Sequence, residues 1–174
     1  MKLTVMQKRL LDEFLVAQLK GLSVTAIIGE FNCVHSSVRN HLGPFQEWFG
    51  VDTDKDALKK IKDELKSDKI HVRYGVVSSH VDLPDNGCDV LLCPLLLHAQ
   101  KDLGDVLQVL QAKVAFGGKV VIVDFSDAEK VIRSVDGEHY FHKEKGVELL
   151  LSKLRGFSKK PVADCFVAYE WVKV

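Results

Sequence analysis

The sequence predicts a doubly wound α/β fold, in which a mostly parallel sheet carries helices on both faces. Short apolar runs rich in β-branched residues alternate with helical segments, which is the pattern of βαβ units. The runs are continuously apolar, as in strands that are buried on both faces. The length of 174 residues fits one domain. We therefore predict a single domain over 1–174, with an N-terminal helix (1–22), a core (23–126) and a C-terminal helix and strand (127–174).

The first half of the chain is predicted to begin with a helix and to continue with alternating strands and helices. Apolar residues at helical spacing predict the first helix over 4–20, with Thr4 and Gln7 as its capping box. The apolar run VTAII predicts the first strand over 24–28, which ends at Gly29. The next predicted elements are a short helix over 36–42, a strand over 48–51, a helix over 55–66 and a strand over 70–77.

The second half continues the alternation. A polar turn over 82–87 precedes a strand over 89–93. Gly117 and Gly118 are expected to end a helix over 102–115. The remaining predicted elements are a strand over 119–125, a helical or irregular piece over 127–135, a helix over 144–154 and a last strand over 162–173.

The charge balance argues against some partners. There are 24 basic and 24 acidic side chains, so no nucleic-acid or membrane surface is expected to be held mainly by electrostatics. No apolar run approaches the roughly 20 residues that a membrane span needs. The N-terminus is charged and has no signal-peptide core.

The cysteines indicate a reducing compartment. Cys33, Cys88, Cys93 and Cys165 form no CxxC pair, and they lack the ligand spacing of a zinc site. Scattered cysteines in apolar runs are typical of reduced, buried thiols. We therefore predict a cytoplasmic protein without a metal site.

The residues that follow the strands are the candidates for ligand binding, because open α/β sheets bind ligands beyond the carboxyl ends of their strands. The strongest candidate is Asp52, an acidic residue that ends the second strand. Its carboxylate offers two acceptor oxygens to the two hydroxyls of an adenosine ribose. The alternative is that Asp52 or Asp54 caps the helix that follows. The sequence leaves both interpretations open.

Several landmarks follow one another in a recognisable order. They lie in FGVDTDKDAL (49–58), HVRYGVVSSHVDLPDNGCDVLLCPLLLHA (71–99) and LQAKVAFGGKVVIVDF (110–125). Together these segments resemble class I S-adenosylmethionine-dependent methyltransferases, and most of all the type 11 group. The matching landmarks are Asp52, Leu83-Pro84, Asp89, Leu97-His98 and Gly117-Gly118. The resemblance covers roughly 24–125 and implies a Rossmann-like sheet of seven strands.

The resemblance also implies S-adenosylmethionine as the cofactor and an unidentified small molecule or protein as the methyl acceptor. Gly29 matches the first loop glycine of the family, and Asp52 matches its ribose-binding acid. Pro94 and Leu95 match positions beside the sulfonium. The implied cofactor-binding residues are Gly29, Glu30, Phe31, Asn32, Asp52, Thr53, Ser78, Ser79, His80 and Pro94.

The predicted cofactor loop departs from the family pattern. The family uses Gly-x-Gly-x-Gly, whose glycines let the backbone approach the cofactor closely. Here Phe31 and Cys33 take the later glycine positions, and we expect Phe31 to fill space near the methionine moiety. Glu30 and Asn32 are expected to compensate by holding the methionine amino group. Ser79 stands where the family often has an aspartate.

Two functions stay open. One is a methyltransferase, with His80 or His98 as a candidate general base, and His139 and His142 in a substrate lid. The other is an inactive methyltransferase-like domain that binds protein partners. A nicotinamide-binding domain ranks last, because no G-x-G-x-x-G motif is present.

The histidines and the first helix each have a plainer interpretation. The alternative for every one of these histidines is a structural or exposed position, so no catalytic residue is assigned. In the first helix, Val5, Val16 and Leu19 lie outside the main apolar stripe. That pattern predicts cover on more than one side, either within the chain or in a dimer. Monomer and homodimer both stay open.

Overall fold

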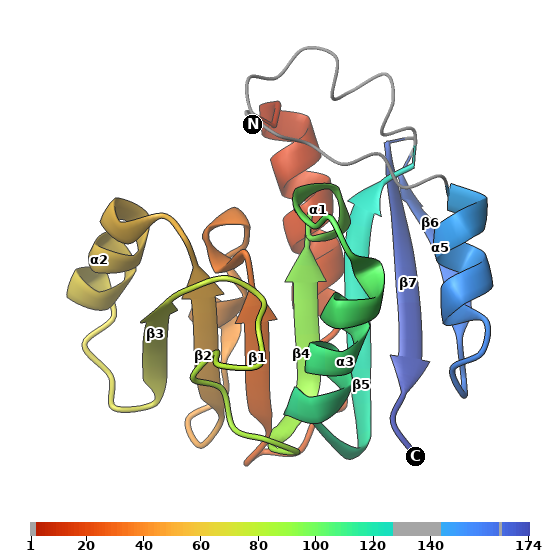
Figure 1. The fold of residues 1–174 in the computed structure, drawn as a ribbon. Helices are drawn as coiled ribbons and strands as arrows, with labels where there is room; N and C mark the ends of the chain where they lie inside the picture. The colour runs from red at the N-terminus through yellow and green to blue at the C-terminus, as the bar shows by residue number, and fades with distance from the viewer. Residues whose placement is uncertain (1–2, 127–143, 164) are drawn as a thin grey trace.

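The structure is a computed structural model that describes residues 3–126, 144–163 and 165–174. Its core is one seven-stranded sheet in the order β3-β2-β1-β4-β5-β7-β6 (Figure 1). Neighbouring strands from β3 to β5 are parallel, whereas β7 runs antiparallel to β5 and β6. The strands are β1 (Ile27–Phe31), β2 (Glu47–Asp52), β3 (Ile70–Tyr74), β4 (Cys88–Pro94), β5 (Val114–Phe125), β6 (Ser158–Ala163) and β7 (Phe166–Val172).

Helices cover both faces of this sheet, which confirms the predicted fold class. One face packs against α1 and α2, and the other against α3 and α5. Successive residues of β4 point to opposite faces: Val90 and Leu92 join the core under α1 and α2, and Leu91 and Cys93 join the core under α3 and α5. The helices are α1 (Val5–Ala17), α2 (Lys55–Glu64), α3 (Leu103–Lys113) and α5 (Glu144–Leu151).

Local capping signals start the helices where the sequence predicted. Thr4 and Gln7 form the predicted capping box of α1. The carboxylate of Asp54 accepts the backbone N–H of Ala57 at the start of α2, and Asp102 caps α3 in the same manner. Each cap satisfies backbone donors that a helix leaves free in its first turn.

The first helix is only partly covered. Leu11 and Leu15 are fully buried, and Val16 and Leu19 pack against the core as half-buried side chains. Val5 remains 87% exposed. Cover within the chain therefore accounts for most of the apolar side chains of α1. None of the helices in the described residues is long and apolar enough to cross a membrane.

The first strand is shifted relative to its prediction. It was expected over 24–28, but β1 spans Ile27–Phe31, so Gly29, Glu30 and Phe31 lie inside the sheet. The prediction is wrong because Glu30 looks like a loop residue in the sequence. In the structure its carboxylate is paired with other side chains in the interior, which makes a buried strand position tolerable.

Three other elements differ from their predictions. Gly117 and Gly118 do not end the preceding helix but lie inside β5, which begins at Val114 directly after α3. The expected helix over 36–42 is replaced by two short 3₁₀ helices, η1 (Cys33–His35) and η2 (Val38–His41). The expected last strand over 162–173 is an antiparallel hairpin of β6 and β7. Lys159 and Lys160 make β6 polar, and the strand also contains Pro161. Both features are usual for an edge strand, and they hide β6 in the sequence. The predicted element over 127–135 and both His139 and His142 fall outside the described residues.

Substitution of Gly29 tests this placement. A Cβ atom at Gly29 would lie 2.7 Å from Leu91 Cδ1 and 2.8 Å from Cys88 Sγ, and both neighbours are fully buried. We expect Gly29→Ala to lower the free energy of unfolding by about 1–3 kcal/mol, as overpacking does. Denaturant unfolding measures the change.

Gly146→Ala is the matched control, because Gly146 lies in α5 and no atom lies within 4 Å of an added Cβ. Alanine is the better helix former, so this variant should be as stable as the wild type or up to about 1 kcal/mol more stable. Equal effects of the two substitutions would contradict the packing role of Gly29.

Candidate functional site

The candidate site lies at the carboxyl ends of the parallel strands. Within the sheet, β2 and β3 lie on one flank of β1. The chain then crosses back, and β4 and β5 lie on the other flank. The strand order therefore reverses between β1 and β4, and such a switch point is where open α/β sheets bind ligands. The polar or turn-forming residues at or next to these strand ends are Asn32, Asp52, Pro94 and Asp124.

Asp52 ends β2 and is held by backbone groups on three sides. Its Oδ1 accepts the N–H of Thr53 at 2.7 Å and of Asp54 at 3.0 Å. Its Oδ2 accepts the N–H of Val34 at 3.2 Å, from the segment that follows β1. The side chain is 6% exposed. Asp54 provides the N-cap of α2, so helix capping does not explain why an acidic residue ends β2. Ligand binding between β1 and β2 is the interpretation of Asp52 that stays open.

Asn32 joins the ends of β1 and β4. Its Nδ2 donates to the carbonyl oxygens of Pro94 at 3.1 Å and of Leu95 at 3.0 Å. Both Asn32 and Leu95 adopt the left-handed conformation, with φ of 53° at each. Asparagine tolerates this conformation better than most residues. We refer to the two hydrogen bonds as the Asn32 bridge.

Glu30 lies in the interior of the sheet, not at the carboxyl ends of the strands. The side chain is fully buried, and it accepts the hydroxyl of Ser36 on Oε1 and the indole N–H of Trp48 on Oε2 at 2.9 Å. Burial raises the pKa of Glu30 to about 7, although these hydrogen bonds oppose the rise. The expectation that Glu30 belongs to the loop is therefore wrong.

Gly29 and Phe31 are likewise strand residues. Gly29 lies in the middle of β1, so it cannot be the first glycine of a loop that follows the strand. Phe31 is 1% exposed and belongs to the apolar core under α3 and α5. The expectation that its ring fills space in the loop is wrong for the same reason. The left-handed turn that opens the loop falls on Asn32.

The loop that follows β1 is tied to several elements. Both the N–H and the hydroxyl of Ser37 donate to the carboxylate of Asp12 in α1, each at 2.6 Å. The guanidinium of Arg39 donates to the carbonyls of Cys33 and Ser36. Burial lowers the pKa of His35 in this loop, and the nearby charge of Asp52 opposes the shift. The loop is thus held to α1 through Ser37 and to itself through Arg39.

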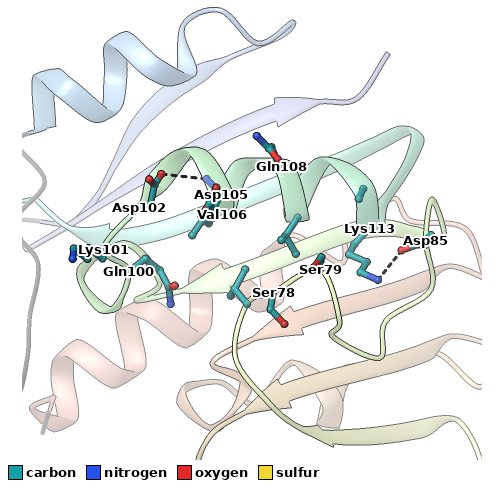
Figure 2. Close-up of a pocket in the computed structure, with 13 residues that line it drawn as sticks. Ser78, Ser79, Asp85, Gln100, Lys101, Asp102, Asp105, Val106, Gln108 and Lys113 are labelled. Carbon is teal, nitrogen blue, oxygen red and sulfur yellow. Dashed lines mark hydrogen bonds and ion pairs between the residues drawn. The ribbon is translucent and has the colours of Figure 1, made fainter.

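Ser78 and Ser79 lie on a separate wall. They line a groove of about 910 Å³ between the segment after β3 and helix α3 (Figure 2). In this view Ser78 and Gln100 lie toward one end of the groove, and the ion pair of Lys113 with Asp85, 2.6 Å, lies at the other. His80 is exposed and does not line this groove.

One buried pair was missed by the sequence reasoning. Nδ1 of His98 lies 3.2 Å from Oδ1 of Asp124, and both side chains are buried. Asp124 also accepts the N–H of Leu97 at 2.7 Å and of Phe125 at 2.8 Å, so it joins the ends of β4 and β5. The available signal was a single acidic residue in the apolar run KVVIVDF.

The other predicted positions are also placed by the structure. Thr53 is exposed at the start of the segment that leads to α2, and Pro94 is buried at the end of β4. The carboxyl ends of neighbouring strands therefore carry Asn32, Asp52, Thr53 and Pro94. Within the described ranges, no group of three or more His, Cys, Asp or Glu side chains could hold a metal ion.

The strand order, the antiparallel β7 and the polar strand ends define a Rossmann-like fold of the class I methyltransferase type. A family model described as a methyltransferase domain matches residues 31–122, more than half of the sequence. The chain belongs to this methyltransferase domain family, which confirms the resemblance drawn from the sequence. A comparison with curated proteins found no match.

Several solved structures share the fold. A SAM-dependent methyltransferase from Aquifex aeolicus has a TM-score of 0.69 and 14% identity, with 99% of this chain and 100% of that chain covered. The YcgJ protein of Bacillus subtilis has a TM-score of 0.71 and 14% identity, with 88% and 70% covered. Phosphoethanolamine N-methyltransferase 2 of Haemonchus contortus, solved with S-adenosyl-L-methionine, has a TM-score of 0.73 and 10% identity, with 93% and 52% covered.

The buried carboxyl group of Glu30 is expected to make the free energy of unfolding depend on pH. Because its pKa is raised from 4.5 to about 7 in the folded protein, the folded state holds the proton more tightly than the unfolded state. The resulting stabilisation is fully present below about pH 4.5 and is lost as the pH rises through 7. Relative to Glu30→Gln, the wild type should lose on the order of 3 kcal/mol across this range.

Denaturant unfolding of both proteins from about pH 4.5 to about pH 8 measures this difference. Glu64→Gln, at an exposed site at the end of α2, is the control and should follow the wild-type profile. A difference between wild type and Glu30→Gln that is flat across the range would show that Glu30 is not a buried, titrating group.

Proposed function

We propose that this chain binds S-adenosylmethionine at the carboxyl ends of β1, β2 and β4 and transfers its methyl group to a small molecule or a protein side chain. Membership of the methyltransferase domain family supports the proposal. The observation that carries it is the position of Asp52, a buried carboxylate at the end of β2 beside the loop after β1.

The carboxylate of Asp52 has enough acceptor positions for a ribose. A carboxylate has about four acceptor positions, and backbone N–H groups take three of them here. The longest of the three bonds, 3.2 Å, comes from Val34. A bound ribose would replace this bond and use the remaining position, while Thr53 and Asp54 keep the carboxylate in place.

The other predicted contacts extend from this point. We assign the adenine end to the Ser78 and Ser79 wall, where two neighbouring side chains carry hydroxyl groups on the groove of Figure 2. His80 is exposed, does not line this groove and stays a weaker candidate. Pro94, at the end of β4, is assigned to the neighbourhood of the sulfonium.

Little further chemistry is required of the protein. When bound, S-adenosylmethionine supplies an already activated methyl group, so the main task of the protein is alignment of the acceptor. An oxygen or nitrogen acceptor also gives up a proton. We assign its acceptance to His98, which Asp124 orients through Nδ1, in preference to the exposed His80.

A second candidate function is a methyltransferase-like module that binds a protein partner without a cofactor. A specific observation favours it, because groups that a cofactor would use are already hydrogen-bonded within the chain. The Asn32 bridge spans the switch point, and Asp52 already accepts three N–H groups. In either case we propose that 1–174 acts as one cytoplasmic domain, monomeric or homodimeric. Three buried free cysteines support a reducing compartment.

Asp52→Asn tests the cofactor site by calorimetric titration with S-adenosylmethionine and with S-adenosylhomocysteine. We expect the wild type to bind with a Kd of tens of micromolar or tighter, about −6 kcal/mol. Removal of the charge that binds the ribose should weaken binding by roughly 10- to 150-fold, the worth of a charge-assisted hydrogen bond.

Asp54→Asn is the matched control, since it removes the same charge two residues away and asparagine caps a helix as well as aspartate does. Its affinity should stay within about twofold of wild type. Equal losses in the two variants would contradict a specific role for Asp52. No binding by a folded wild type at millimolar ligand would favour the interaction module.

A further inference from the structure

The Asn32 bridge lies at the place where the fold is expected to bind its ligand. The side-chain amide has two N–H donors, and they bind two carbonyl oxygens at the end of β4, those of Pro94 and Leu95. Asn32 itself follows the last residue of β1. One side chain therefore connects the two strands between which the strand order reverses.

The backbone around the bridge is held in an uncommon conformation on both sides. Asn32 and Leu95 each have a φ of 53°, and Leu95 is fully buried with its N–H donated to the carbonyl of Val123 at 2.7 Å. Left-handed residues other than glycine cost energy and persist only where the surroundings fix them. The two hydrogen bonds of the bridge fix this pair against each other.

The bridge is also coupled to the carboxylate that is proposed to bind the ribose. Two residues after Asn32, the N–H of Val34 binds Oδ2 of Asp52. Val34 lies in η1, a single short turn that begins directly after Asn32. The loop after β1 is thus attached at once to the end of β4 through Asn32 and to the end of β2 through Val34.

We propose that Asn32 is the residue that sets cofactor affinity, because its bridge must open before the ligand occupies the switch point. This inference rests on the proposed function. Opening frees two carbonyl oxygens, which then accept N–H groups of the ligand in place of the Asn32 amide. It also lets the loop after β1 move, which frees Oδ2 of Asp52 for a ribose hydroxyl. Asn32 thus competes with the ligand and does not bind it.

Asn32→Gly tests the proposal in the whole chain. Glycine adopts a φ of 53° without strain, so the variant removes the amide and keeps the backbone. We expect its Kd for S-adenosylhomocysteine, measured by calorimetric titration, to be at least about tenfold tighter than that of the wild type. Hydrogen exchange of the Val34 N–H, which needs no ligand, should be faster in the variant.

Asn86→Gly is the matched control. Asn86 also has a positive φ, 50°, but it is exposed in the turn before β4. It therefore lies at the amino end of this strand, whereas Asn32 binds the carboxyl end. Its affinity and its Val34 exchange should equal those of the wild type. Thermal unfolding of all three proteins shows that they are folded.

The outcomes separate this inference from the proposed function. If the wild type binds and Asn32→Gly binds equally or more weakly, or if Val34 exchange is unchanged, the competing role of Asn32 is overturned and the proposed function stands. Binding by Asn32→Gly but not by the wild type supports the competing role of Asn32 and contradicts the proposed function, because the native chain then keeps its site closed. If neither protein binds, both are overturned.

Discussion

The rest of the structure depends on the parallel pairing of β1 with β4 at the centre of the sheet. Six of the seven residues of β4 are buried, and they supply apolar side chains to both layers of the core. Side chains fix this pair at both ends. At the amino end, the carboxylate of Asp89 accepts the N–H of Ile27 at 2.8 Å, and at the carboxyl end the Asn32 bridge binds β4. Polar contacts outside the apolar core therefore help to fix the pairing of β1 with β4, and Asn32 and Pro94 take their positions from this pairing.

A polar residue inside this pair connects the core to the site. Glu30 is buried between an indole from β2 and a hydroxyl from the loop after β1. Burying a carboxyl group is costly unless its hydrogen bonds are satisfied, so the loop must stay close to the strand from which it leaves. The bond from Ser36 to Glu30 holds the segment between the two short 3₁₀ helices, η1 and η2, close to β1.

The sequence predicted those features that local signals determine. The capping box of α1, the acidic cap of α2 and the acid that ends β2 all follow from residues close together in the chain. The start of β1 could not be predicted from its apolar run, because the partners of Glu30 come from positions 36 and 48. The β6 and β7 hairpin was hidden in the same manner, since an edge strand needs no apolar pattern. Local chemistry thus predicted the position of Asp52 at the end of β2, whereas the hydrogen bonds of Glu30, Asn32 and Asp124 required the tertiary contacts.

These contacts determine how ordered the loop after β1 is and how accessible the proposed cofactor site is. Glycines in such a loop would allow close approach of a cofactor but would leave the loop without side-chain contacts. This chain instead has Asn32, Ser36 and Ser37, and each of them ties the loop to a different strand or helix. In the proposed cofactor site, the same hydrogen bonds that order the loop occupy acceptors that the ligand would use. On that proposal an ordered loop and an open cofactor site oppose each other, and the affinity for the ligand is the difference between the bonds it makes and the bonds that the loop gives up.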